Sequence, residues 1–143
     1  MSRQLRGYLV PPEGEMRDVV FEDHKDIQRI IGCRCFTSMP SLFDDEPACY
    51  VNDEGKLDMS APNRAIYDDG SCVDITFGNM FFCGVDMATG EARSITDEEV
   101  RKVRRRFGGG KEGPGSGLKM LKRVRFELAL RLSKRELVKH GKI

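Results

Sequence analysis

The sequence predicts an α+β fold, with a small and mostly antiparallel sheet, one or two packed helices and a tethered, basic amphipathic helix at the C-terminus. Short apolar runs separated by turn residues indicate strands joined as hairpins. Two segments carry apolar residues at helical spacing between capping signals. The net charge changes from −11 over residues 1–100 to +12 over residues 101–143, which sets the C-terminal part apart from the rest.

The composition is that of a soluble globular protein. The chain has 143 residues, of which 39% are hydrophobic and 33% charged, and this length allows one domain with a core plus an appendage. No apolar run approaches the roughly 20 residues of a membrane span, and the N-terminus has no apolar signal segment. Five cysteines without a secretory signal indicate reduced thiols and a cytoplasmic location.

The first part of the chain is typical of strands around one helix. Residues 5–10 and 17–21 are rich in strand formers and predict a hairpin. Asp23 can cap a helix that ends at Gly32, a residue suited to the left-handed position after a helix. Residues 33–36 predict the next strand.

Two further hairpins and a central strand are expected in the middle of the chain. Residues 48–51 and 56–59 flank the turn sequence NDEG and predict one hairpin. Residues 64–67 and 72–75 flank an Asp-Asp-Gly turn and predict another. Residues 80–85, MFFCGV, form the most apolar run and predict the central strand.

The second helix has the clearest start signal. Thr96 and Glu99 form a capping box, and Ile95 and Val100 form a hydrophobic staple around it. Acidic residues in the first turn and arginines in the last turn suit the helix dipole. We expect this helix to end near residue 107.

A glycine-rich segment, residues 108–117, separates the acidic α+β domain, residues 1–107, from the basic part, residues 118–143. Its glycines match the Gly-x-Gly-x-x-Gly string of pyrophosphate-binding loops, but such a loop follows a strand, whereas this one follows a helix. Six glycines in ten residues favour a flexible linker instead.

The basic part predicts an amphipathic helix over residues 118–140 with apolar side chains on two sides. One side carries Leu118, Leu121, Val124, Leu128 and Leu132, and a narrower strip carries Phe126, Leu130 and Leu137. A helix that is apolar on two sides needs a partner to cover it. We therefore expect a homo-oligomer formed through residues 118–140.

The residues show no catalytic signature, no metal site and no cofactor motif. Neither of the two histidines neighbours a nucleophile motif, and the cysteines lack the paired spacing of zinc ligands. The adjacent acids Asp44-Asp45 and Asp68-Asp69 are typical of solvated turns. We therefore expect a protein that is not an enzyme and takes no cofactor.

Asn63 and Arg64 are the strongest candidates for contact with a ligand. A guanidinium presents a planar fork of donors that matches phosphate oxygens, while Tyr67 could stack on a base and Asp68 could bind ribose hydroxyls. These four residues would suit a nucleotide-like anion. Alternatively, Asn63 caps a turn and Arg64 pairs with nearby acids, which the residues alone favour. Contacts to an anion or partner could also come from five cations: Arg104, Arg105, Lys119, Lys122 and Arg123.

Three segments carry a family resemblance: GYLVPPEGEMRDVVFEDHKDIQRIIG, VNDEGKLDMSAPNRAIYDDGSCVDITFGNMFFCGVD and SITDEEVRKVRRRF. Together they resemble a family of small uncharacterised domains carried by bacteriophages, plasmids and integrated elements of bacteria. The resemblance covers residues 5–107, and its most specific element is Pro-Asn-Arg-Ala at 62–65. The family has no attached activity, so no site residue is carried over. The resemblance implies a mobile-element accessory protein in a bacterial cytoplasm, of a kind that often binds without catalysis and interferes with host defence.

Three functions remain open at this point. The first is a non-catalytic anti-defence binder that sequesters a nucleotide-derived anionic signal through Asn63 and Arg64. The second is a nucleic-acid-binding accessory protein that uses the basic C-terminal helix. The third is a protein–protein inhibitor of a host defence factor, whose acidic domain imitates a polyanion. The first is slightly favoured, because the basic part has few aromatic residues for base stacking.

Overall fold

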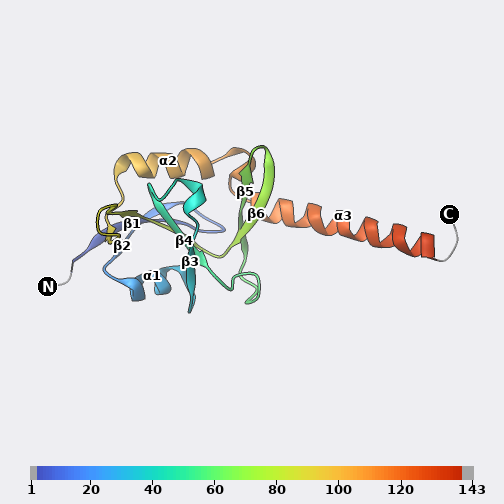
Figure 1. Cartoon of the computed structure of the whole chain (residues 1–143), viewed down its shortest axis with the longest axis horizontal. Coiled ribbons are helices and arrows are strands. Elements are labelled where there is room, and N and C mark those ends of the chain that lie inside the picture. Colours follow the sequence, from blue (N-terminus) through green and yellow to red (C-terminus); the bar gives the residue numbers. More distant parts are fainter. Residues whose placement is uncertain (1–2, 140–143) are drawn as a thin grey trace.

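A computed structural model of the chain describes residues 3–139, with side chains described as far as Leu130. The larger sheet has six strands in the order β2-β1-β7-β4-β3, with β8 paired to β7, while β5 and β6 form a separate two-stranded sheet (Figure 1). All of these strand pairs are antiparallel, so the predicted α+β class is confirmed.

The strands are β1 Leu5–Val10, β2 Arg17–Phe21, β3 Phe36–Ser38, β4 Ala48–Asn52, β5 Pro62–Asp68, β6 Ser71–Phe77, β7 Met80–Val85 and β8 Ala92–Arg93. The α-helices are α1 His24–Ile31, α2 Asp97–Phe107 and α3 Ser116–Lys139, and two short 3₁₀ helices are η1 Pro40–Leu42 and η2 Gly110–Glu112.

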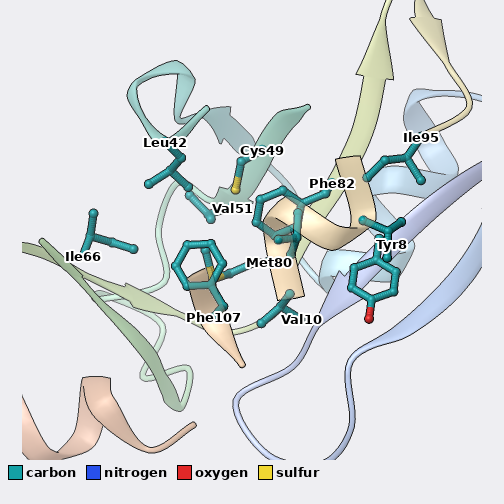
Figure 2. Close-up of a cluster of buried hydrophobic side chains, with 12 residues drawn as sticks. Tyr8, Val10, Leu42, Cys49, Val51, Ile66, Met80, Phe82, Ile95 and Phe107 are labelled. Carbon is teal, nitrogen blue, oxygen red and sulfur yellow. The ribbon is translucent and has the colours of Figure 1, made fainter. Parts of the chain in front are cut away.

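The core has two parts, one on each face of the larger sheet, and α2 and α1 lie on opposite sides of that sheet (Figure 1). Successive residues of β7 alternate between them: Phe82 packs with Phe107 under α2 (Figure 2), whereas Phe81 packs with Phe21 and the α1 side. Burial on both faces explains why this strand is a continuous apolar run. Its predicted central position is confirmed.

The caps of the two packed helices are those that the sequence predicts. Asp23 accepts a hydrogen bond from the Asp26 amide, and Gly32 closes α1 with a φ of 81°. At α2, Thr96 Oγ1 accepts from the Glu99 amide at 3.1 Å, and a Glu99 carboxylate oxygen accepts from the Thr96 amide at 3.0 Å. The capping box is therefore confirmed.

Two predicted strands are wrong. Residues 56–59 form turns rather than the second strand of a hairpin, because the Glu54 carbonyl accepts from the amides of Leu57 and Asp58, both at 2.9 Å. The strand expected at 33–36 is displaced to Phe36–Ser38, because Cys33 still bonds to the end of α1. Strand β4 accordingly pairs with β3 and β7.

The glycine-rich segment is a packed turn rather than the expected flexible linker. Ser116 Oγ accepts from the Ala65 amide at 2.9 Å, and Glu112 accepts from the Tyr67 amide at 2.7 Å, so the segment covers the outer edge of β5. Gly117 lies so close to this strand that a Cβ would stand 2.7 Å from the Asn63 carbonyl oxygen.

Helix α3 begins at Ser116, two residues before the predicted start, and then extends away from the rest of the protein (Figure 1). The side chains of Leu132 and Leu137, and the predicted helix end at residue 140, lie outside the described residues. None of the helices in the described part of the chain is both long enough and apolar enough to cross a membrane.

Candidate anion-binding site

Arg64 lies inside the protein, where its guanidinium contacts main-chain carbonyls. The side chain is 1% exposed. Its Nε and Nη2 donate to the Phe107 carbonyl oxygen at 3.2 and 3.1 Å, and its Nη1 donates to the Pro11 carbonyl oxygen at 3.1 Å and to Asn63 Oδ1 at 2.7 Å. Arg64 therefore joins β5 to the end of α2 and to the turn after β1.

Asn63 is fully buried and completes the same network. Its Nδ2 donates to the carbonyl oxygens of Val10 and Gly78, both at 2.8 Å. The sequence suggested a pair of ligand-binding side chains here. In the structure both serve as internal hydrogen-bonding partners, because β5 crosses the ends of β1 and α2 and their carbonyls need donors.

The charge of Arg64 is balanced by a helix end rather than by the acids that the sequence offers nearby. Burial lowers the pKa of its guanidinium. Within the described residues Arg64 makes no ion pair, but Phe107 is the last residue of α2, where the helix dipole places partial negative charge. Arg64 is therefore an internal side chain whose partners are oxygens of Phe107, Pro11 and Asn63, and the pairing with nearby acids that the sequence suggested is not found among the described residues.

One cavity, of about 340 Å³, is lined by Arg64 and Arg104 and also by Glu15. Arg104 Nη1 donates to the Tyr8 hydroxyl at 3.2 Å. This cavity holds charges of both signs, so it is a weaker anion site than the next one.

The stronger candidate is a cavity of about 400 Å³ between β5, the glycine-rich turn and the start of α3, which we name the cationic cavity. Its nine lining residues are Tyr67, Gly110, Lys111, Pro114, Gly115, Ser116, Lys119, Met120 and Arg123. Three of them are cationic and none is acidic. Gly115 and Ser116 lie at the N-terminus of α3, the end of a helix dipole that favours anions.

The aromatic wall of the cationic cavity is Tyr67. Its ring is half-buried, and Lys111 Nζ stands 4.8 Å from the ring centroid. This cation–π contact holds an ammonium group at the cavity without neutralising it. A ligand that combines phosphate with a flat ring would find both kinds of partner within this one site.

A half-buried ion pair holds the turn in place. Arg106 Nε and Nη2 donate to the two carboxylate oxygens of Glu112 at 2.9 and 3.1 Å, and Arg106 Nη1 donates to the Leu42 carbonyl oxygen at 2.6 Å. Glu112 also accepts from the Tyr67 amide. Glu112, which directly follows Lys111 in the chain, is therefore already paired with Arg106 and leaves the cavity its positive charge.

The structure separates the other predicted contact residues. Lys119 and Arg123 line the cationic cavity, and Arg123 also makes an exposed pair with Glu127 at 3.4 Å, of the kind that contributes little. Lys122 and Arg105 are exposed outside that cavity, and Asp68 is exposed at the end of β5 beside the turn to β6. Asp68 is therefore not among the residues that line the cationic cavity with Tyr67 and Lys119.

Sequence reasoning missed Lys111 and Ser116, because both belong to the segment expected to be a linker. One signal for a packed turn was present. An acid at 112 follows the arginine run that ends α2, so the sequence offered an ion pair that could fix a turn. In the structure Gly110 and Gly115 of that turn have φ values of 73° and 81°. Alternating glycine and charged residues after a helix are compatible with a turn fixed by ion pairs as well as with a coil.

The cationic side chains of the cavity are suited to electrostatic capture of an anion. Ammonium and guanidinium groups donate charge-assisted hydrogen bonds to phosphate or carboxylate oxygens. Within residues 3–130, no group of three or more His, Cys, Asp or Glu side chains is placed to hold a metal ion.

The fold and the site together define a small α+β domain with a basic C-terminal helix and a cationic cavity at their junction. The chain belongs to the family described as a domain of unknown function, DUF3846, whose model matches residues 5–108. No curated protein and no solved structure matches the chain. The family match ends before Gly110, so Tyr67 belongs to the family domain while Lys111, Lys119 and Arg123 lie beyond it.

Proposed function

We propose that the protein is a non-catalytic binder of a small, phosphate-bearing, nucleotide-like anion, which it holds in the cationic cavity. The observation that carries this proposal is a cavity lined by three cations and an aromatic ring, with no acidic side chain among its lining residues. Binding without conversion lowers the free concentration of a ligand. Sequestration of a nucleotide-derived signal is therefore the way in which such a protein would act as an anti-defence factor in a bacterial cell.

Each wall of the cavity has a role in the proposal. Lys119, Arg123 and the N-terminus of α3 contact phosphate oxygens. Lys111 leaves the ring of Tyr67 to join them, and the exposed ring face then stacks on the base. Arg64 and Asn63 act indirectly, because they fix β5 beneath Tyr67.

Calorimetric titration with cyclic and linear nucleotides, and with inorganic phosphate, tests the proposal. We expect Lys119→Ala and Arg123→Ala each to weaken nucleotide binding by about tenfold or more, since a charge-assisted hydrogen bond contributes about 1.5–3 kcal/mol. Lys122→Ala is the matched control, because it removes the same charge from the same helix outside the cavity. Nucleotide binding unchanged in Arg123→Ala would contradict the proposal.

The same variants distinguish the alternative of nucleic-acid binding. This alternative has one supporting observation, which is that the exposed cations of α3, such as Lys122, continue outside the cavity. A polyanion held by phosphate contacts alone would lose similar affinity in Lys119→Ala and Lys122→Ala, and its binding would fall steeply with salt. A mononucleotide in the cavity would lose affinity in Lys119→Ala and keep it in Lys122→Ala.

A further inference from the structure

Helix α3 exposes large apolar side chains along the part that extends away from the rest of the protein (Figure 1). It has 24 residues, about 36 Å of helix, and its main contacts with the rest of the chain are with β5, β6 and η2. Beyond its first turns, four large apolar side chains are between 47% and 66% exposed: Val124, Phe126, Leu128 and Leu130. Apolar side chains exposed along a helix are typical of a surface that binds a partner.

An apolar groove runs between this helix and β6. It has a volume of about 350 Å³, and its walls include Val73, Ile75 and Phe77 from β6 and Leu121 and Val124 from α3. Val73 is 60% exposed. Leu128 follows Leu121 and Val124 at helical spacing, so it continues the groove's apolar strip along the projecting part of α3.

We propose that the groove and this strip form a dimer interface whose occupant is α3 of a second copy. In an antiparallel pair of helices centred near Val124, Leu128 of each copy lies beside Leu121 of the other and fills its groove. The interface is then the same patch on both copies, as two-fold symmetry requires. The long projecting helix and the groove at its base are complementary parts of one contact.

Two observations favour a second copy as the occupant. The body is acidic, with a net charge of −11 over residues 1–100, whereas residues 101–143 carry +12, so the basic helix of one copy is attracted to the body of another. Apart from Lys56 and Asp74, which pair with each other at 2.9 Å, the exposed side chains at the groove and along its strip are leucine and valine. Phosphate backbones bind cations and would leave these side chains in water.

The proposed interface leaves the cationic cavity open. At about 100° per residue, Lys119 and Arg123 point to the side of α3 opposite Leu121 and Leu128. Phe126 and Leu130 lie on the cavity side as well. One side of α3 therefore serves self-association, and the other serves the ligand site.

Light scattering on the full-length protein at tens of micromolar tests the proposal. We expect twice the chain mass of 16.2 kDa. Leu128→Glu, on the projecting helix, and Val73→Lys, on an exposed strand position, should each give a monomer. Leu130→Glu is the matched control on the opposite side of α3 and should remain dimeric. Thermal melts that stay cooperative show that each variant is folded.

Three results would overturn the proposal. The first is a full-length protein that is monomeric at these concentrations. The second is a dimer that Leu128→Glu and Val73→Lys leave intact. The third is a monomer that co-purifies with nucleic acid and releases it at high salt, which would assign α3 to nucleic acid instead.

Discussion

At the scale of single residues, Arg64 shows how a charge can be buried without a carboxylate partner. Four of its donor contacts are to oxygens of Phe107, Pro11 and Asn63. A main-chain carbonyl at a helix C-terminus carries partial negative charge, and two donors share it here. This arrangement joins three separate elements, so Arg64 contributes mainly to the fold and only indirectly to the ligand site.

Arg64→Ala should therefore lower the free energy of unfolding strongly. Removing the guanidinium leaves three buried acceptors unpaired, for which we expect a loss of about 3–5 kcal/mol. Arg105→Ala is the control, because it removes an exposed arginine from α2 and should cost about 1 kcal/mol or less. Urea denaturation measures both. Similar small losses in the two variants would show that Arg64 is not the strut described here.

At the scale of secondary structure, the sequence predicts best those elements whose signals are local. The capping box of α2 and the uninterrupted apolar run of β7 were predicted correctly, because a cap and a buried strand are each defined by neighbouring residues. Residues 56–59 were predicted wrongly. Their alternation resembles a strand, but hydrogen bonds to the Glu54 carbonyl and the Asp58 side chain stabilise turns instead.

The candidate site was predictable only in part, because the conformation of one of its segments depends on contacts between secondary-structure elements. Tyr67, Lys119 and Arg123 were identified by residue type, and they do line one cavity. Lys111 was missed, because the conformation of residues 108–117 depends on tertiary contacts with β5 rather than on composition. For Arg64, a ligand contact was one of two alternatives. Its actual partners are carbonyls from distant parts of the chain, which the sequence does not reveal.

The capping box makes stability depend on pH. Burial opposes ionisation of Glu99, but hydrogen bonds from Arg93 and Thr96 outweigh it and hold the pKa of Glu99 below its ordinary value of 4.5. A carboxyl with a lowered folded pKa stabilises the fold above its unfolded pKa, and this contribution disappears as the pH falls through the folded pKa.

Glu99→Gln should accordingly lower stability at neutral pH and flatten the decline of unfolding free energy between about pH 6 and pH 3. Chemical denaturation at several pH values measures both effects. Glu98→Gln, at an exposed position in the same turn, should leave the wild-type profile unchanged. A wild-type slope retained in Glu99→Gln would show that other carboxyls govern acid unfolding.

At the scale of the whole molecule, the charge division of the sequence is partly resolved within the chain. Arg106 and Glu112 form a half-buried pair inside the basic part, and that pair attaches the glycine-rich turn to β5. Three of the other cations of this part, Lys111, Lys119 and Arg123, line the cationic cavity. The family domain and the C-terminal helix therefore act as one unit at this junction, because neither part alone supplies both the aromatic wall and the cations.

Gly117→Ala tests this coupling between the helix and the domain. A Cβ at Gly117 would stand 2.7 Å from the Asn63 carbonyl oxygen, a main-chain atom of β5, so the start of α3 must move away from the strand. We expect weaker nucleotide binding by calorimetry and faster hydrogen exchange at the Ala65 amide, which donates to Ser116. Gly109→Ala is the matched control, since Gly109 has extended backbone and a Cβ added there would meet nothing within 4 Å. If Gly117→Ala speeds exchange at the Ala65 amide but binds nucleotide as the wild type does, then the start of α3 is not part of the ligand site. If exchange at the Ala65 amide is unchanged, then β5 and α3 are not held together by this contact.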